Sequence, residues 1–121
     1  MVAGRAEAQS GRGLSYRSKR YLDYVRSHDC CSCGRPAPSE AHHAAPRGIS
    51  PSLHGGGLGQ KMRDMWTIPL CRLCHNGWHA SLTYRQLGGR TVDESDELMA
   101  TEQLKLMSHW LLLVDRDSDL F

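Results

Sequence analysis

The pattern of apolar and polar positions predicts three helices and two short strands. Tyr21, Leu22 and Val25 recur at helical spacing among Arg and Lys residues, so residues 15–26 are expected to form a short amphipathic helix. Residues 75–82 can form a second helix further along the chain. The first of these helices would lead directly into a cluster of cysteines.

A third, longer helix is predicted from Asp93 or Ser95 to Val114. Its apolar stripe is expected to consist of Leu98, Leu104, Met107, Leu111 and Val114. Acidic residues crowd its first turn, where they interact favourably with the helix dipole. The stripe could pack inward or pair two chains, so the pattern leaves the oligomeric state open.

Two short strands are expected to pair as a hairpin. Residues 40–44 follow a turn at residues 34–38, where two prolines exclude a helix and a central strand. Residues 65–70 would form the second strand, and Pro69 fits a strand end. Between the strands, the glycine-rich residues 46–61 predict a long loop without secondary structure, which in a compact domain usually has a function or is mobile.

The length of 121 residues fits one small domain with flanking segments. Residues 1–14 are rich in Gly, Ala, Ser and Arg and are expected to form a flexible basic arm. Residues 15–114 would form the domain with its flanking helices, and residues 115–121 an acidic tail. Because the chain is only 40% hydrophobic and has one Phe, a bound metal would add stability to a small core.

Charge is unevenly distributed along the chain, although the net charge is only +2. Residues 1–29 carry six Lys or Arg against three Asp or Glu, and residues 30–89 carry six against two. Residues 90–121 carry three against eight. The basic first two thirds suit a polyanionic partner, although such an imbalance can also be an ordinary solvated surface.

The five cysteines lie in two short clusters that predict a zinc site. Cys30 and Cys33 form one Cys-x-x-Cys turn, Cys71 and Cys74 form a second, and 37 residues separate the two turns. Each such turn directs two thiolates at one tetrahedral ion, so these four residues are expected to hold a structural Zn²⁺. A redox Cys-x-x-Cys is the alternative. Cys31 has no role in either interpretation.

The cysteine count and the lack of targeting signals indicate a soluble, cytoplasmic protein. An odd number of clustered cysteines argues against a secreted disulfide framework. The N-terminal residues lack the apolar region of a signal peptide. No stretch approaches the roughly 18 to 20 apolar residues that span a bilayer, so no membrane partner is expected.

Four of the seven histidines form a pattern that suits a catalytic metal. His75 and His79 are four residues apart on a predicted helix, so both imidazoles project from one face. His42 and His43 are consecutive on a predicted strand, so they point to opposite faces or splay at its end. A metal held by His42, His75 and His79 would keep open positions for water and phosphate, which leaves His43 to accept a proton near neutral pH. Alternatively, His79 only caps or packs, and His42 replaces a thiolate in the zinc site.

The order of motifs along residues 28–82 carries a family resemblance. The motifs are Cys-x-x-Cys-Gly, Glu40-Ala-His-His, a glycine-rich loop, and a run from Asp64 through Trp-Thr-Ile-Pro-Leu-Cys to His75 and His79. In this order they resemble the HNH endonucleases of the ββα-metal group, and most of all the phage recombination-enhancement (Ref-like) nucleases. The resemblance implies an α+β fold, in which a small ββα-metal finger is clasped by a four-cysteine zinc site and flanked by helices.

The resemblance also implies a role for each residue of the site. It makes His43 the general base that activates water. It implies three ligands for a catalytic Mg²⁺ or another divalent ion, namely His42, His75 and His79. One departure is Trp66, because many HNH sequences have at this position an Asn that helps orient the base. Asp64 could orient His43 by accepting an imidazole N–H, but it could equally ligate the metal or only close the loop.

The implied function is that of a metal-dependent DNA endonuclease or nickase that leaves a 5′ phosphate and a 3′ hydroxyl. Five basic residues could grip the flanking phosphates: Arg47, Lys61, Arg63, Arg72 and Arg85. They do not indicate a sequence preference, or whether the substrate is single-stranded or duplex, DNA or RNA. The resemblance implies a protein that is encoded by a phage or its bacterial host. It also allows a nuclease that acts only together with a partner such as a recombinase filament. From a different class, the alternative is a non-catalytic zinc module that binds nucleic acid or protein.

Overall fold

The computed structural model describes residues 17–57, 61–81 and 86–117 of the chain. Within these residues it contains four helices and one two-stranded sheet. The elements are α1 (Lys19–Arg26), β1 (Glu40–His43), α2 (Pro51–His54), β2 (Thr67–Leu70), α3 (Arg72–Ala80) and α4 (Val92–Arg116). This arrangement confirms the predicted α+β class. The predicted basic arm lies outside the described residues.

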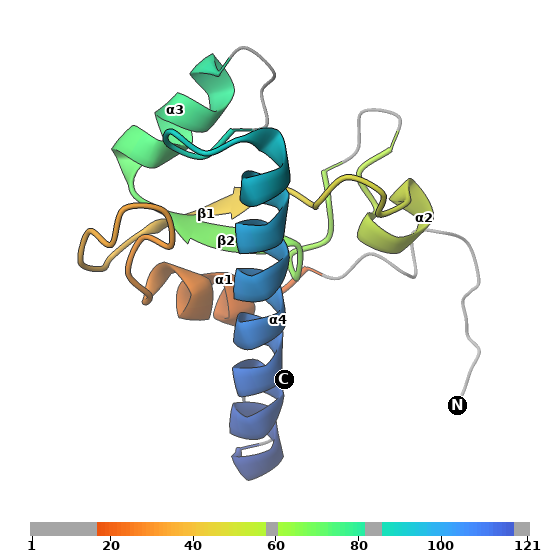
Figure 1. Ribbon diagram of the computed structural model, residues 1–121. Helices are drawn as coiled ribbons and strands as arrows, with labels where there is room; N and C mark the ends of the chain where they lie inside the picture. Colours follow the sequence, from red (N-terminus) through yellow and green to blue (C-terminus); the bar gives the residue numbers. More distant parts are fainter. Residues whose placement is uncertain (1–16, 58–60, 82–85, 118–121) are drawn as a thin grey trace.

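The two strands form the antiparallel hairpin that the sequence predicts, with Glu40 opposite Leu70 and His43 opposite Thr67. All four residues of β2 are buried, because α1, α3 and α4 all contact this strand. Figure 1 shows α1 and α3 on opposite sides of the hairpin, with α4 running past both. The hairpin is therefore enclosed by helices, and its two faces meet different partners.

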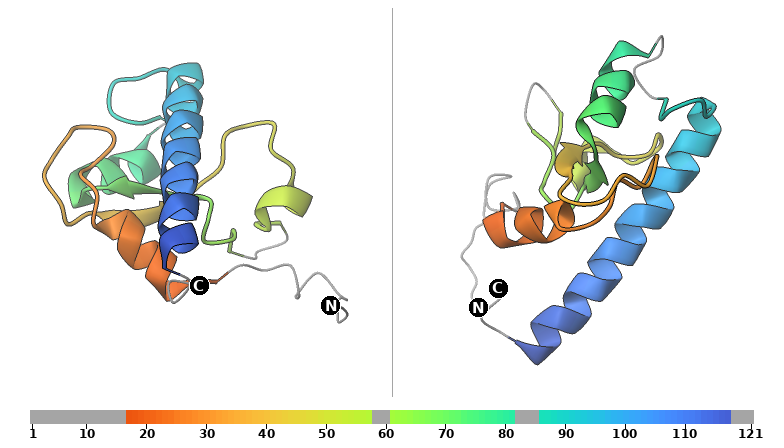
Figure 2. Two further views of the ribbon diagram at one scale, coloured as in Figure 1. Left: turned by 90° about the horizontal axis from the view of Figure 1, so that it is seen from below. Right: turned by 90° about the vertical axis from the view of Figure 1, so that its left-hand side faces the viewer.

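Two hydrophobic clusters stabilise this arrangement, and α4 contributes to both. One joins the hairpin to α3 and the first half of α4, and it includes Ile68, Leu70, Trp78, Leu87 and Met99. The other joins α1 to the second half of α4 through Tyr21, Val25, Leu106, Trp110 and Val114. Figure 2 shows α4 crossing α1 and extending beyond the hairpin. This long helix thus fixes α1 relative to the hairpin.

The predicted apolar stripe of α4 is wrong at two of its five positions. Leu104 and Leu111 are 65% and 59% exposed. The buried apolar face instead consists of Met99, Leu106, Trp110 and Val114. The two sets share Val114, while Met107 and Leu111 each lie one residue after a buried position, roughly 100° further around the helix. Aromatic packing of Trp110 against Tyr21, with ring centroids 5.3 Å apart, selects the observed face.

Several element boundaries also differ from the prediction, among them the start of α1 at Lys19 rather than at residue 15 and of β2 at Thr67 rather than at residue 65. The loop at residues 46–61 is not free of secondary structure, because α2 begins at Pro51 and ends before Gly55, whose φ is 83°. Helix α3 begins at Arg72 rather than at residue 75, directly after β2. Helix α4 continues to Arg116, beyond the predicted start of the acidic tail. No helix in the described segments is long and apolar enough to cross a membrane.

Candidate metal and catalytic site

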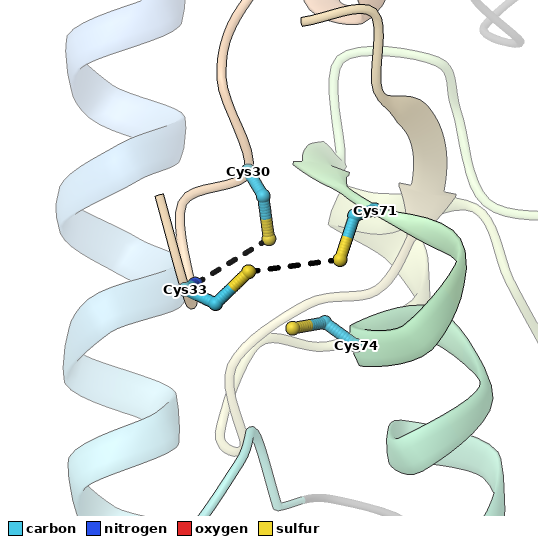
Figure 3. A group of neighbouring side chains, drawn as sticks. All are labelled: Cys30, Cys33, Cys71 and Cys74. Carbon is cyan, nitrogen blue, oxygen red and sulfur yellow. Dashed lines mark hydrogen bonds between the residues drawn. The ribbon is translucent and has the colours of Figure 1, made fainter. Parts of the chain in front are cut away.

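The four cysteines of the two Cys-x-x-Cys turns lie together. Cys30 and Cys33 come from the turn that follows α1, Cys71 is the N-cap of α3, and Cys74 lies in the first turn of that helix. Their Sγ atoms all lie within 4.8 Å of one another, and Cys33 Sγ is 3.7 Å from Cys71 Sγ. Figure 3 shows the four side chains converging. Sulfurs bound at 2.3 Å to one tetrahedral ion would lie roughly 3.8 Å apart, so this group could bind a metal such as zinc.

Local backbone structure explains why the first turn directs its thiols inward. Gly34 has a φ of 81°, which a residue with a side chain rarely adopts. This conformation turns the chain so that Arg35 O accepts from Cys30 N–H at 2.9 Å, and Gly34 N–H donates to Cys30 O at 2.9 Å. In the same turn, Cys33 N–H points at Cys30 Sγ, 3.5 Å away. A backbone N–H that faces a sulfur stabilises its thiolate form.

The thiols of this cluster differ in acidity. Burial raises the pKa of Cys30, but hydrogen bonds from backbone N–H groups, chiefly those of Cys33 and Cys71, outweigh it and lower the pKa to about 6. Burial raises the pKa of Cys74 to about 12. Four adjacent thiolates repel one another, so the group needs a cation before it loses all its protons.

Cys31 lies beside this group without joining it. Its N–H donates to Pro69 O at 3.0 Å, and its side chain packs against the cluster around Ile68. Burial raises the pKa of Cys31 to about 12, so the thiol stays protonated and unreactive. Its backbone fastens the cysteine turn to β2.

A second group of possible ligands consists of His42 on β1 with His75 and His79 on α3. Their ligand atoms also lie within 4.8 Å of one another. The ring centroid of His42 is 4.7 Å from that of His75 and 5.4 Å from that of His79. The structure therefore groups His42 with the two helical histidines and not with the thiols.

The environment of His42 suits a metal ligand. The residue is 4% exposed, and among the described residues its Nε2 atom has no hydrogen-bond partner. Burial, followed by the nearby imidazoles of His75 and His79, lowers the pKa of His42 to about 3. The ring is therefore neutral at physiological pH. Because a buried nitrogen without a partner is costly, a cation beside the three imidazoles would satisfy it.

Glu40 supports this group from the same face of β1, two residues before His42. Its Oε1 atom lies 2.8 Å from His75 Nδ1, and Arg72 Nη2 lies 2.9 Å from its Oε2. The hydrogen bond from His75 is the main cause that lowers the pKa of Glu40. The charge and the hydrogen bond of Arg72 lower this pKa further. No role for Glu40 was predicted from the sequence. The two-residue period of a strand was the signal that could have placed it beside His42.

His43 faces the other side of the strand and meets Asp64. The distance from His43 Nε2 to Asp64 Oδ1 is 2.9 Å, and Ser18 N–H donates to Asp64 Oδ2 at 2.7 Å. Asp64 is 3% exposed, and Arg17 Nη1 lies 3.7 Å from its Oδ1 atom. Burial lowers the pKa of His43 despite the bond to Asp64, so its ring is neutral near pH 7. With Nε2–H donated to Asp64, Nδ1 carries the lone pair that can accept a proton.

Trp66 packs away from this pair. Its backbone N–H donates to Arg63 O at 2.9 Å, and its carbonyl accepts from Ala44 N–H at 3.0 Å. The indole lines an apolar pocket together with Ile49 and Met107. Trp66 thus joins the hairpin to α4, and it is Asp64 that contacts His43.

The five predicted phosphate-binding residues lie in different surroundings. Lys61 is exposed, and its charge contributes to the lowered pKa of His43, which places it near that ring. Arg72 is bonded to Glu40 with 76% of its side chain exposed. The structure ties the other two described residues elsewhere, Arg47 to Asp93 and Asp96 on α4 and Arg63 to carbonyls of α2. Arg85 lies outside the described residues.

Arg17 is a further basic residue near His43, and sequence analysis missed it. Its guanidinium donates to Met62 O at 2.7 Å and to Lys61 O at 2.8 Å. These bonds hold the segment before Asp64 against the start of α1. Nothing in the local sequence indicates such contacts, because they join residues 44 and 45 positions apart.

The described residues thus define a small α+β protein in which a cysteine group and a separate histidine group could each hold a metal. The chain belongs to the family described as "Protein of unknown function (DUF968)", which matches residues 11–101. It is similar to the uncharacterized protein YdfU of Escherichia coli (strain K12), with 36% identity over 61 residues. This match covers 50% of the chain and 16% of YdfU. No solved structure matches the chain significantly.

Proposed function

We propose that this chain is an endonuclease or nickase of the HNH type, which hydrolyses phosphodiester bonds in DNA. One observation carries the proposal: β1 supplies a histidine to a group of three imidazoles, and its next residue, His43, contacts the buried carboxylate of Asp64. The hairpin and α3 provide all four histidines, as in a ββα-metal finger. The motif order that resembles HNH endonucleases supports the same function.

The two groups of ligands are proposed to hold two different ions. Four thiols suit a structural Zn²⁺ that clasps the finger. Three imidazole ligands leave positions open, as a catalytic ion requires, and they favour zinc, iron or nickel rather than the expected Mg²⁺, which prefers oxygen ligands. When bound, such an ion would stabilise negative charge on the phosphate and on the leaving 3′ oxygen.

His43 and Asp64 are proposed to activate the attacking water. Nδ1 of His43 accepts a proton from water while Nε2–H remains bonded to Asp64, whose carboxylate stabilises the resulting imidazolium. The water oxygen then forms a bond to phosphorus as the bond from phosphorus to the 3′ oxygen breaks. The products are a 5′ phosphate and, after protonation, a 3′ hydroxyl. Ser18 N–H holds the second carboxylate oxygen of Asp64 and so fixes its orientation.

Two exposed basic residues are proposed to hold the substrate backbone. Lys61 lies near His43, and Arg72 shares Glu40 with His75, so they would contact phosphates on the two sides of the scissile bond. Contacts of this kind bind DNA without reading its sequence.

A plasmid-nicking assay with His43→Ala tests the proposal. Wild-type protein with structural zinc in place would be incubated with supercoiled DNA and Zn²⁺, Ni²⁺, Mn²⁺ or Mg²⁺, with and without a recombinase filament. We expect His43→Ala to keep its zinc and its DNA binding but to cut roughly 10²- to 10⁴-fold more slowly. His109→Ala, at an exposed histidine of α4, is the matched control and should cut normally.

Two results would contradict the proposal. Normal cleavage by His43→Ala would remove His43 as the base. Wild-type protein that binds DNA but cuts it with none of these ions, even with the filament, would be a non-catalytic binding module.

A further inference from the structure

The carboxylate of Glu40 bridges two residues of α3. Glu40 and His42 are two residues apart on β1, so both face α3. Glu40 Oε1 lies 2.8 Å from His75 Nδ1, while Glu40 Oε2 accepts Arg72 Nε at 3.0 Å and Arg72 Nη2 at 2.9 Å. Each carboxylate oxygen therefore has its own partner, which is His75 for Oε1 and Arg72 for Oε2.

This bridge fixes the tautomer of His75. A carboxylate only accepts hydrogen bonds, so His75 Nδ1 must carry the proton, and in a neutral ring the lone pair is then on Nε2. The ring of His75 lies 4.7 Å from that of His42 and 5.1 Å from that of His79, measured between centroids. Its Nε2 atom is thus the one available to an ion shared with these two rings.

We propose that Glu40 is a positioning residue that orients His75 for metal binding through its own contact with Nδ1. The inference rests on the proposed function of the histidine group as a metal site. Glu40 itself is not among the residues whose ligand atoms gather there, so it acts through His75. A carboxylate behind a metal-binding imidazole also raises the basicity of the ligand, and removing such a partner typically weakens metal binding.

A purely structural role of Glu40 predicts a different result. Arg72 and Glu40 are 76% and 36% exposed at their side chains, and an exposed ion pair contributes little to folding. If this pair were the main function of Glu40, losing Arg72 and losing Glu40 would have the same small effect. The positioning role predicts that only the loss of Glu40 changes metal binding.

The test compares two substitutions of similar size, Glu40→Met and Glu40→Gln. Protein with Zn²⁺ retained in the cysteine group would be titrated with Co²⁺, followed by calorimetry and by the visible absorption of the bound ion. Glu40→Met has no acceptor for His75, so its Co²⁺ affinity should fall about 10- to 100-fold and its absorption spectrum should change. Glu40→Gln keeps a carbonyl oxygen that can accept the proton of Nδ1, so it should retain most of the affinity. Arg72→Met, the control, should bind nearly as well as the wild type.

The outcomes separate this inference from the proposed function. Wild-type protein that binds no Co²⁺ beyond the cysteine group would overturn the histidine metal site, and the role of Glu40 with it. Binding by the wild type and equal binding by Glu40→Met would overturn only the role of Glu40. Zinc content and circular dichroism of each variant confirm that the fold is retained, so a weaker affinity in Glu40→Met alone supports the inference.

Discussion

At the scale of single residues, the contact between Asp64 and His43 sets which nitrogen of the neutral imidazole carries the lone pair. The 2.9 Å contact joins Nε2 to Asp64 Oδ1, which Arg17 Nη1 also approaches at 3.7 Å, while Ser18 N–H donates to Oδ2. The sequence left three roles open for Asp64, namely orienting His43, ligating the metal or closing the loop. It could not choose among them, because the contact joins residues 21 positions apart and depends on how the loop folds back.

We expect Asp64→Asn to slow DNA cleavage by roughly 10²- to 10⁴-fold, as when a catalytic histidine is left in the wrong tautomer. An amide can donate its N–H to Nε2, which would place the imidazole proton on Nδ1, where the base must accept one. Cleavage under single-turnover conditions measures the effect, and Co²⁺ binding to the histidine group should not change. Asp115→Asn, an exposed acid on α4, is the control. Equal cleavage by Asp64→Asn and wild type would exclude this role of Asp64.

At the scale of elements, the two strands and three helices, α1, α3 and α4, were predicted because their signals are local. The prolines of the turn and the spacing of His75 and His79 depend only on neighbours in the sequence, whereas α2, inside the glycine-rich loop, was not predicted. The face of α4 was not predictable in this way. Leucines line more than one side of this helix, and only packing against α1 and the hairpin decides which side is buried.

A matched pair of leucines in α4 tests that assignment. Leu106 is fully buried between α1 and α4, whereas Leu104, two residues earlier, is 65% exposed. Leu106→Ala should lower the free energy of unfolding by about 2–5 kcal/mol, because it leaves a cavity. Leu104→Ala should change it by no more than about 0.5 kcal/mol. Urea denaturation measures both values, and a larger loss for Leu104→Ala would mean that the other face of α4 is buried.

At the scale of the whole molecule, the grouping of the four cysteines was predictable, but the ion pairs between distant charged residues were not. The spacing of the two cysteines in each Cys-x-x-Cys turn is typical of metal ligands, so the sequence was enough to group all four cysteines. By contrast, Arg47 was expected to contact phosphate, and it pairs with Asp93 and Asp96, 46 and 49 positions away. Contacts between distant exposed charges leave no local pattern in a sequence.

The cysteine group joins the turn after α1, the end of β2 and the first turn of α3, so a metal bound there should stabilise the whole domain. Replacing one ligand by Cys71→Ser should abolish tight zinc binding and lower the free energy of unfolding by several kcal/mol, since metal affinity in such sites is folding energy. Cys31→Ala is the matched control, because it removes a partly buried thiol outside the group and should keep its zinc. Zinc content and urea denaturation, each with and without a chelator, measure the effect. A Cys71→Ser protein that holds zinc and unfolds like the wild type would show that these thiols do not clasp the fold.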